Sequence, residues 1–156
     1  MRESLLPATA RLAIALRALA LSVWFGGGIA TMLATAAVFA RAESRKLAGD
    51  FAGAILRRTN LLRDAAVIVF VIAALLGARG ASTWCGGVCV ILQLAVIPVD
   101  AATRHVRREL GGSIDALPAD DPRRRRFGAL HGIAMLLLLL QIVAAALGIA
   151  LSARVK

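Results

Sequence analysis

The sequence predicts an all-α integral membrane protein that folds as a four-helix bundle. The composition is the first reason: of 156 residues 60% are hydrophobic and 18% are charged, against about 45–50% apolar and about 25% charged residues in soluble domains. The second reason is that four long stretches contain no Asp, Glu, Lys or Arg. The third is length, since three of these stretches reach the roughly 20 residues that a helix needs to cross a hydrocarbon core of about 30 Å.

The charge-free stretches are Ala18–Ala40, Ala65–Ala78, Gly80–Val99 and Phe127–Ala153, with 23, 14, 20 and 27 residues. The 28 charged side chains are therefore confined to the other 72 residues. This pattern excludes a disordered chain, a collagen and a disulfide framework. We predict a single domain over residues 1–156, with membrane helices at about 15–40, 61–78, 81–104 and 124–152 and an amphipathic surface helix at about 42–60.

The first stretch could also be read as a secretory signal, because Val38-Phe39-Ala40 offers the small residues that a signal peptidase favours. Its 23 apolar residues exceed the 7–15 residues of a signal sequence. We therefore expect an uncleaved first membrane helix.

The segment 42–60 places Leu47, Phe51 and Ile55 near helical spacing among charged residues, which predicts a helix lying on the membrane surface. The second membrane helix has only 14 charge-free residues, about 21 Å of helix, so it must extend back through residues 61–62. That extension places Arg63 and Asp64 inside or at the edge of the bilayer, and an arginine there can snorkel toward the headgroups.

Turn and cap signals separate the remaining helices. Residues 77–80 (Gly-Ala-Arg-Gly) predict a tight turn between the second and third helices. The segment Thr103–Leu110 predicts a charged extension of the third helix, ended by Gly111-Gly112. Asp121 before Pro122 predicts a capped start of the fourth helix, ahead of its apolar part.

The net charge is +10 and the isoelectric point is near 11.6. Thirteen of the 19 basic residues lie in the first and third connections, so the positive-inside rule places both long loops in the cytoplasm and both termini outside, in the cell inner membrane. Three arginines precede the first helix, and a dominant first helix would give the reverse orientation. Anionic lipid headgroups are the expected partner of these arginines. The chain has no nucleic-acid-binding motif, and we expect no nucleic-acid partner. Its glycine pairs favour close helix packing and leave a homo-oligomer open.

One cluster of polar side chains is the candidate functional site. Projection of the predicted helices onto membrane depth brings these residues to the cytoplasmic side, with an acid and a base one turn apart on the third helix. Ionisable groups at this depth either form structural pairs or line an ion or ligand site. The cluster consists of Asn60, Asp64, Asp100, Arg104 and His131.

Two weaker patterns suggest a metal. His105 and His131 could ligate one haem iron from neighbouring helices. Cys85 and Cys89 share a helical face, although their spacing is one residue longer than in the usual Cys-x-x-Cys motifs. No conventional catalytic motif is present. We therefore expect a non-enzymatic protein without a cofactor, and keep a haem- or copper-linked membrane redox protein as the alternative.

Several segments resemble the transmembrane-protein-205-like family, whose members are four-helix membrane proteins of unknown function. Residues 23–28 (Val-Trp-Phe-Gly-Gly-Gly) are similar to its first-helix signature. Residues 37–39, followed by 48–49, 52–53, Arg58 and Asn60, are similar to its first loop, and residues 127–131 followed by Gln141 to its last helix. The resemblance covers about residues 17–151 and implies a four-helix membrane bundle.

The chain departs from that family where Ala37 replaces a common proline and where Ala134 and Leu138 replace a serine and an asparagine. A polar site that used those side chains would be incomplete here. A more distant likeness is to copper-resistance D proteins and to membrane oxidases of haem synthesis, whose histidines usually lie in early helices, whereas both histidines here follow residue 100. The expected function is the binding or passage of a small solute or ion, or the support of a membrane partner.

Overall fold

The computed structural model describes residues 7–110, 117–118 and 120–153, and these residues form a bundle of four helices. The helices are α1 (Ala8–Arg41), α2 (Arg45–Leu75), α3 (Ala81–Leu110) and α4 (Pro122–Ala153). α3 and α4 lie close to the predicted positions, and α3 includes the predicted charged extension to Leu110. α1 begins earlier than predicted, and α2 joins the predicted segments 42–60 and 61–78. The predicted stop at Gly111-Gly112 and the basic residues at both chain ends lie outside the described residues.

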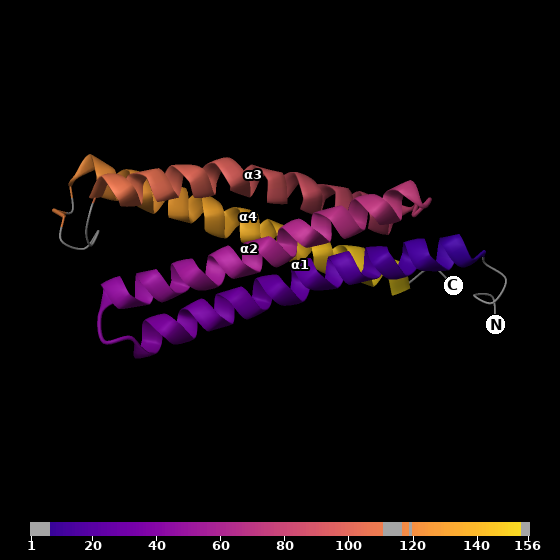
Figure 1. Cartoon of the computed structure of the whole chain (residues 1–156), viewed down its shortest axis with the longest axis horizontal. Coiled ribbons are helices and arrows are strands. Elements are labelled where there is room, and N and C mark those ends of the chain that lie inside the picture. Colours follow the sequence, from indigo (N-terminus) through magenta and orange to yellow (C-terminus); the bar gives the residue numbers. More distant parts are fainter. Residues whose placement is uncertain (1–6, 111–116, 119, 154–156) are drawn as a thin grey trace.

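The helices are arranged as two hairpins (Figure 1). α1 packs along α2, and α3 packs along α4. Contact between the hairpins is made mainly by α1 and α4, while α2 and α3 touch little. The hairpins lie close together at the end that holds the termini, and they diverge toward the α1–α2 and α3–α4 connections (Figure 1).

Three helices, α1, α3 and α4, are long and apolar enough to cross a membrane. Helices of 30 to 34 residues are about 45–51 Å long, whereas the hydrocarbon core of a bilayer is about 30 Å thick. The structure is thus that of a helical membrane protein whose helices extend beyond the hydrocarbon core.

The core of the bundle is built on one tryptophan and several small residues. Trp24 is completely buried, and its ring centroid lies 5.8 Å from that of Phe70. Phe70 in turn packs against Gly86 on α3, so closely that a Cβ atom at position 86 would lie 2.6 Å from the ring Cζ. Close approach of backbones at small residues is how helices associate in lipid.

α2 is one unbroken helix, in which the predicted surface helix at 42–60 leads directly into the predicted membrane helix at 61–78. The Ser44 side chain caps it by accepting a 3.2 Å hydrogen bond from the Leu47 amide. The predicted apolar face is exposed at Leu47 and Phe51, and the buried side chains in this half are Ala48 and Ala52. Alanines, with little bulk, allow α2 to pack along α1 through this region. The contact of Leu47 and Phe51 with a membrane surface stays a prediction.

The turn between α2 and α3 is tight, as predicted. Gly77 and Gly80 have φ angles of 95° and 105°, a conformation that side-chain-bearing residues rarely adopt. The buried Arg17 of α1 fixes this turn, because its Nη1 donates hydrogen bonds to the Arg79 carbonyl (3.0 Å) and to the Thr83 hydroxyl (3.1 Å).

α4 begins at Pro122 after Asp121, as predicted. The Asp121 carboxylate accepts hydrogen bonds at 2.8 Å from the Arg123 amide and at 2.8 Å from the Arg123 guanidinium. These bonds, the side-chain bond above all, lower the pKa of Asp121 to about 2.

Because this pKa is depressed in the folded state, the stabilisation from the carboxylate is present above the unfolded value of about 3.9 and is lost as the pH falls through about 2. An NMR titration of the Asp121 carboxyl carbon is expected to show a midpoint near 2. In Arg123→Gln the midpoint is expected to move toward 3.9. A midpoint near 3.9 in the unmodified protein would contradict this hydrogen-bonded cap.

Candidate functional site

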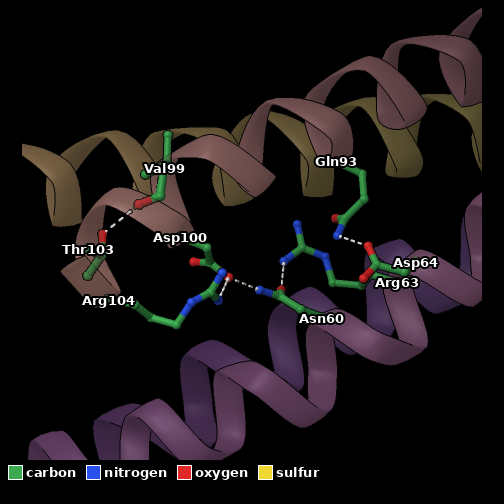
Figure 2. Close-up of polar contacts among 8 residues, drawn as sticks. All are labelled: Asn60, Arg63, Asp64, Gln93, Val99, Asp100, Thr103 and Arg104. Carbon is green, nitrogen blue, oxygen red and sulfur yellow. Dashed lines mark hydrogen bonds and ion pairs between the residues drawn. The ribbon is translucent and has the colours of Figure 1, made fainter. Parts of the chain in front are cut away.

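The predicted polar cluster lies between α2 and α3 (Figure 2). Asn60 of α2 donates a 2.9 Å hydrogen bond from Nδ2 to the Asp100 carboxylate of α3. Arg104 lies one turn beyond, with its guanidinium 3.8 Å from the same carboxylate oxygen, which confirms the predicted acid–base pair. On its other side, Asn60 accepts a 3.0 Å hydrogen bond from Nη1 of Arg63.

Arg63 extends this network to α4. Its Nε donates a 2.8 Å hydrogen bond to Oε1 of Gln141, and its Nη2 donates to the same oxygen. The Gln141 amide nitrogen donates to the Cys89 carbonyl at 2.9 Å and to the Gln93 side chain at 3.3 Å. Gln93 completes the series by donating a 2.7 Å hydrogen bond to Asp64. Seven polar side chains on three helices are thereby connected from Arg104 to Asp64.

Arg63 does not snorkel, which corrects the expectation from the sequence. Its side chain is only 2% exposed, and its hydrogen bonds to described residues go to amide oxygens rather than to a carboxylate. Its own carbonyl accepts a 3.2 Å hydrogen bond from Nε1 of Trp24. Arg63 lies in the interior because its side chain reaches Gln141 of α4, whereas Arg57 and Arg58 of the same helix are exposed.

The depth of this network follows from its partners. Cys89 is the tenth of the 20 residues of the charge-free stretch on α3, and Gln141 is the fifteenth of 27 on α4. The guanidinium therefore lies near the middle of both apolar stretches. A charge at this depth is costly unless it is hydrogen-bonded and faces the bundle interior or a hydrated cavity.

A small cavity of about 60 Å³ adjoins the network. Asn60, Asp100 and His131 from the predicted cluster line it together with Arg63. This volume holds a few water molecules, since one water needs about 10–15 Å³ measured in this way. Asp64 is not among the lining residues and contacts Gln93 instead. The structure thus brings Asn60, Asp100 and His131 together and leaves Asp64 at the other end of the network.

A groove of about 1020 Å³ lies beyond this cavity, toward the diverging ends of the hairpins. Asp100, Thr103 and His131 line both the groove and the cavity, and Arg104 lines the groove alone. With Asn60 in the cavity, four of the five predicted residues border one of the two spaces. Six basic and two acidic residues line the groove. The basic residues are Arg45, Lys46, Arg57, Arg104, Arg107 and Arg108, and the acidic ones are Asp50 and Asp100.

Arg107 links the two hairpins across this groove. Its Nη2 donates a 3.3 Å hydrogen bond to the Gly49 carbonyl of α2. Its guanidinium carbon lies 5.6 Å from the ring centroid of Phe127 on α4, a cation–π contact. Phe127 stacks on His131, with ring centroids 6.3 Å apart and planes 6° from parallel. The groove therefore has aromatic surface as well as positive charge.

The four candidate metal ligands differ in their burial and in their contacts. His105 is exposed and pairs with Glu109 at 3.0 Å, whereas His131 lines the groove. Cys89 is buried, and its thiol contacts the Gln141 carbonyl at 3.7 Å, while Cys85 is half-buried. In the part of the chain that the structure describes, no group of three or more His, Cys, Asp or Glu side chains could hold a metal ion.

Reasoning from the sequence did not place Gln93 and Gln141 in the site, although both are central to it. A signal for them exists. The chain contains one asparagine and two glutamines, each glutamine being the only amide side chain of its charge-free stretch. All three meet at or near Arg63.

Comparison with models of protein families, with curated proteins and with solved structures gave no match. The resemblance to the transmembrane-protein-205-like family stays a prediction.

Proposed function

We propose that this chain is a multi-pass inner-membrane protein that binds a small anionic solute in the groove between its two hairpins, without catalysing a reaction. The observation that carries the proposal is the continuity of positive charge, from the groove lined by six basic residues to the buried guanidinium of Arg63. Positive charge in a cleft with low-dielectric walls raises the local concentration of anions.

Arg63 supports the inner part of this site. A guanidinium has five N–H groups, and its bonds to described residues use three of them. Arg63 also lines the cavity that adjoins the groove. An anion that enters the cavity can therefore accept hydrogen bonds from a cation whose position is already fixed by Gln141 and Asn60.

Asp100 opposes the anion. Its carboxylate borders both spaces and holds Asn60 and Arg104. A bound anion has to compete with this carboxylate for the same donors, which favours anions of high charge density over chloride.

The membrane arrangement belongs to the same proposal. α2 carries only 14 charge-free residues, but its second half packs Ala66, Phe70 and Ala73 into the bundle. We therefore take α2 as a fourth span beside the three apolar ones. The excess of basic residues in the long connections supports a cytoplasmic location for the open end of the groove.

Calorimetric titration of the purified protein with inorganic phosphate tests the binding. Arg57→Gln is expected to weaken phosphate binding about fivefold. This factor corresponds to about 1 kcal/mol, the contribution of one partly exposed charge pair. Arg58→Gln is the matched control, because Arg58 is the exposed neighbour of Arg57 and does not line the groove.

Asp100→Asn is expected to strengthen phosphate binding, since it removes the competing negative charge and keeps the shape of the side chain. Equal weakening by Arg57→Gln and Arg58→Gln, or weaker binding in Asp100→Asn, would contradict an anion site in this groove.

A further inference from the structure

The level of the groove points to the source of the anion. Its lining residues begin where the apolar stretches end: Phe39 is the second-last residue of the stretch on α1, Asp100 follows the stretch on α3, and Phe127 opens the stretch on α4. A helix that crosses the hydrocarbon core meets the phosphate headgroups at this level, since the bilayer with its polar regions is about 40–45 Å thick. The groove therefore opens in the headgroup layer.

The size of the groove exceeds the needs of a simple anion. At about 1020 Å³ it reaches the upper end of the 300–1,000 Å³ typical of sites for drug-sized molecules. An inorganic anion bound at the cations would leave most of this space unfilled. The occupant that fits carries a larger, partly apolar body behind its charge.

The lining has the matching chemistry. Phe39, Leu56 and Phe127 provide apolar surface beside the arginines. Arginine binds phosphate oxygens with two parallel hydrogen bonds. Arg107 lies over the Phe127 ring and donates a hydrogen bond to the Gly49 carbonyl, and these two contacts position its guanidinium in the groove. The hairpins diverge toward this end of the bundle (Figure 1), and these apolar side chains give an acyl chain a surface to lie against within the groove.

On these grounds we propose that the anion in the groove is the phosphate headgroup of a phospholipid with net negative charge, whose acyl chains lie between the hairpins. This inference rests on the proposed function, since it names the anion that the groove binds. Basic pockets between membrane helices are suited to such headgroups. Charge complementarity selects an anionic lipid over a zwitterionic one, because six basic side chains face only two acidic ones.

Native mass spectrometry of the protein released from nanodiscs tests this inference. The nanodiscs contain equal amounts of phosphatidylglycerol and phosphatidylcholine. Phosphatidylglycerol is expected to remain bound in excess over phosphatidylcholine. Arg104→Gln and Arg107→Gln are each expected to lower this excess about fivefold. Arg58→Gln and Arg123→Gln, whose side chains do not line the groove, are expected to leave it unchanged.

A second variant separates the lipid from a dissolved anion. Gly53→Leu keeps every cation but fills part of the groove, where a Cβ atom would already lie 3.2 Å from Nη1 of Arg107. It is expected to abolish lipid retention while phosphate binding by calorimetry persists. Circular dichroism confirms that the variant is folded.

The outcomes distinguish the two proposals. Phosphate binding that depends on Arg57, without retention of phosphatidylglycerol, would overturn the lipid inference and leave the proposed function standing. Retention of both lipids in equal amounts would also overturn the inference. Absence of both phosphate and lipid binding would overturn the proposed function as well.

Discussion

Replacing Gln141 with leucine is expected to lower the free energy of unfolding by about 3 kcal/mol, because a buried charged donor that loses its hydrogen-bond acceptor is no longer compensated for its lost hydration. The Gln141 side-chain oxygen accepts from two nitrogens of Arg63, which is 2% exposed. In the leucine variant the guanidinium keeps only Asn60 among its described side-chain partners. Reversible unfolding in mixed detergent micelles, followed by far-ultraviolet circular dichroism, measures the difference.

The control for this prediction is the double variant Arg63→Met with Gln141→Leu. Apolar residues of similar size can replace a buried polar pair at little cost in stability. The double variant is therefore expected to be more stable than Gln141→Leu alone. A loss below about 1 kcal/mol in the single variant, the size of an ordinary hydrogen bond, would show that water in the adjoining cavity replaces Gln141.

Gly86→Ala is expected to destabilise the bundle by about 2 kcal/mol, the usual cost of overpacking a core. The added methyl group would meet the ring of Phe70, whose Cζ lies 2.6 Å from the Cβ position. Phe70 cannot move freely, because it packs against the buried ring of Trp24. The same unfolding measurement applies.

Gly87→Ala is the matched control for Gly86→Ala, since a Cβ atom at position 87 meets nothing within 4 Å. Its stability is expected to exceed that of the unmodified protein by up to about 1 kcal/mol, because alanine favours a helix interior over glycine. In the double variant Gly86→Ala with Phe70→Leu, the loss is expected to be smaller than the sum of the two single losses, because both changes act on one contact. Equal losses at positions 86 and 87 would contradict close packing at Phe70.

The helices were predictable from the sequence because apolar stretches and turn residues are local signals. The charge-free stretch Gly80–Val99 identifies the third helix, and Gly77 and Gly80 identify the turn before it. Neither identification requires knowing which helices pack together. The packing of the first half of α2 along α1 was not predictable in this way. This half packs through Ala48 and Ala52, and small residues give no periodic signal against a background rich in alanine.

The two tryptophans show the same limit. Both stand in a Trp-x-Gly-Gly motif, and tryptophan is common at membrane interfaces. Trp84 is 80% exposed, but Trp24 is fully buried and donates a hydrogen bond to the Arg63 carbonyl. The two tryptophans differ because α2 packs beside α1 at Trp24. This packing is not evident from the residues around either tryptophan.

The candidate site was predicted in part. Projection of helices onto depth placed Asn60, Asp100 and His131 together, since residues at the same end of antiparallel helices are neighbours. The same projection misplaced Arg63 and left out the glutamines. Burial of Arg63 depends on partners from α4, which depth alone does not identify.

The division of the bundle into hairpins has a consequence for biogenesis. Ribosomal synthesis delivers α1 and α2 first, whereas Gln141 follows Arg63 by 78 positions along the chain. Until α4 emerges, the first hairpin has to reside in the translocation channel or the bilayer with a cation that lacks its principal acceptor. Docking of the second hairpin then withdraws that cation from water and headgroups. A chain truncated before α4 would therefore lack the acceptor that holds this arginine in the bundle interior.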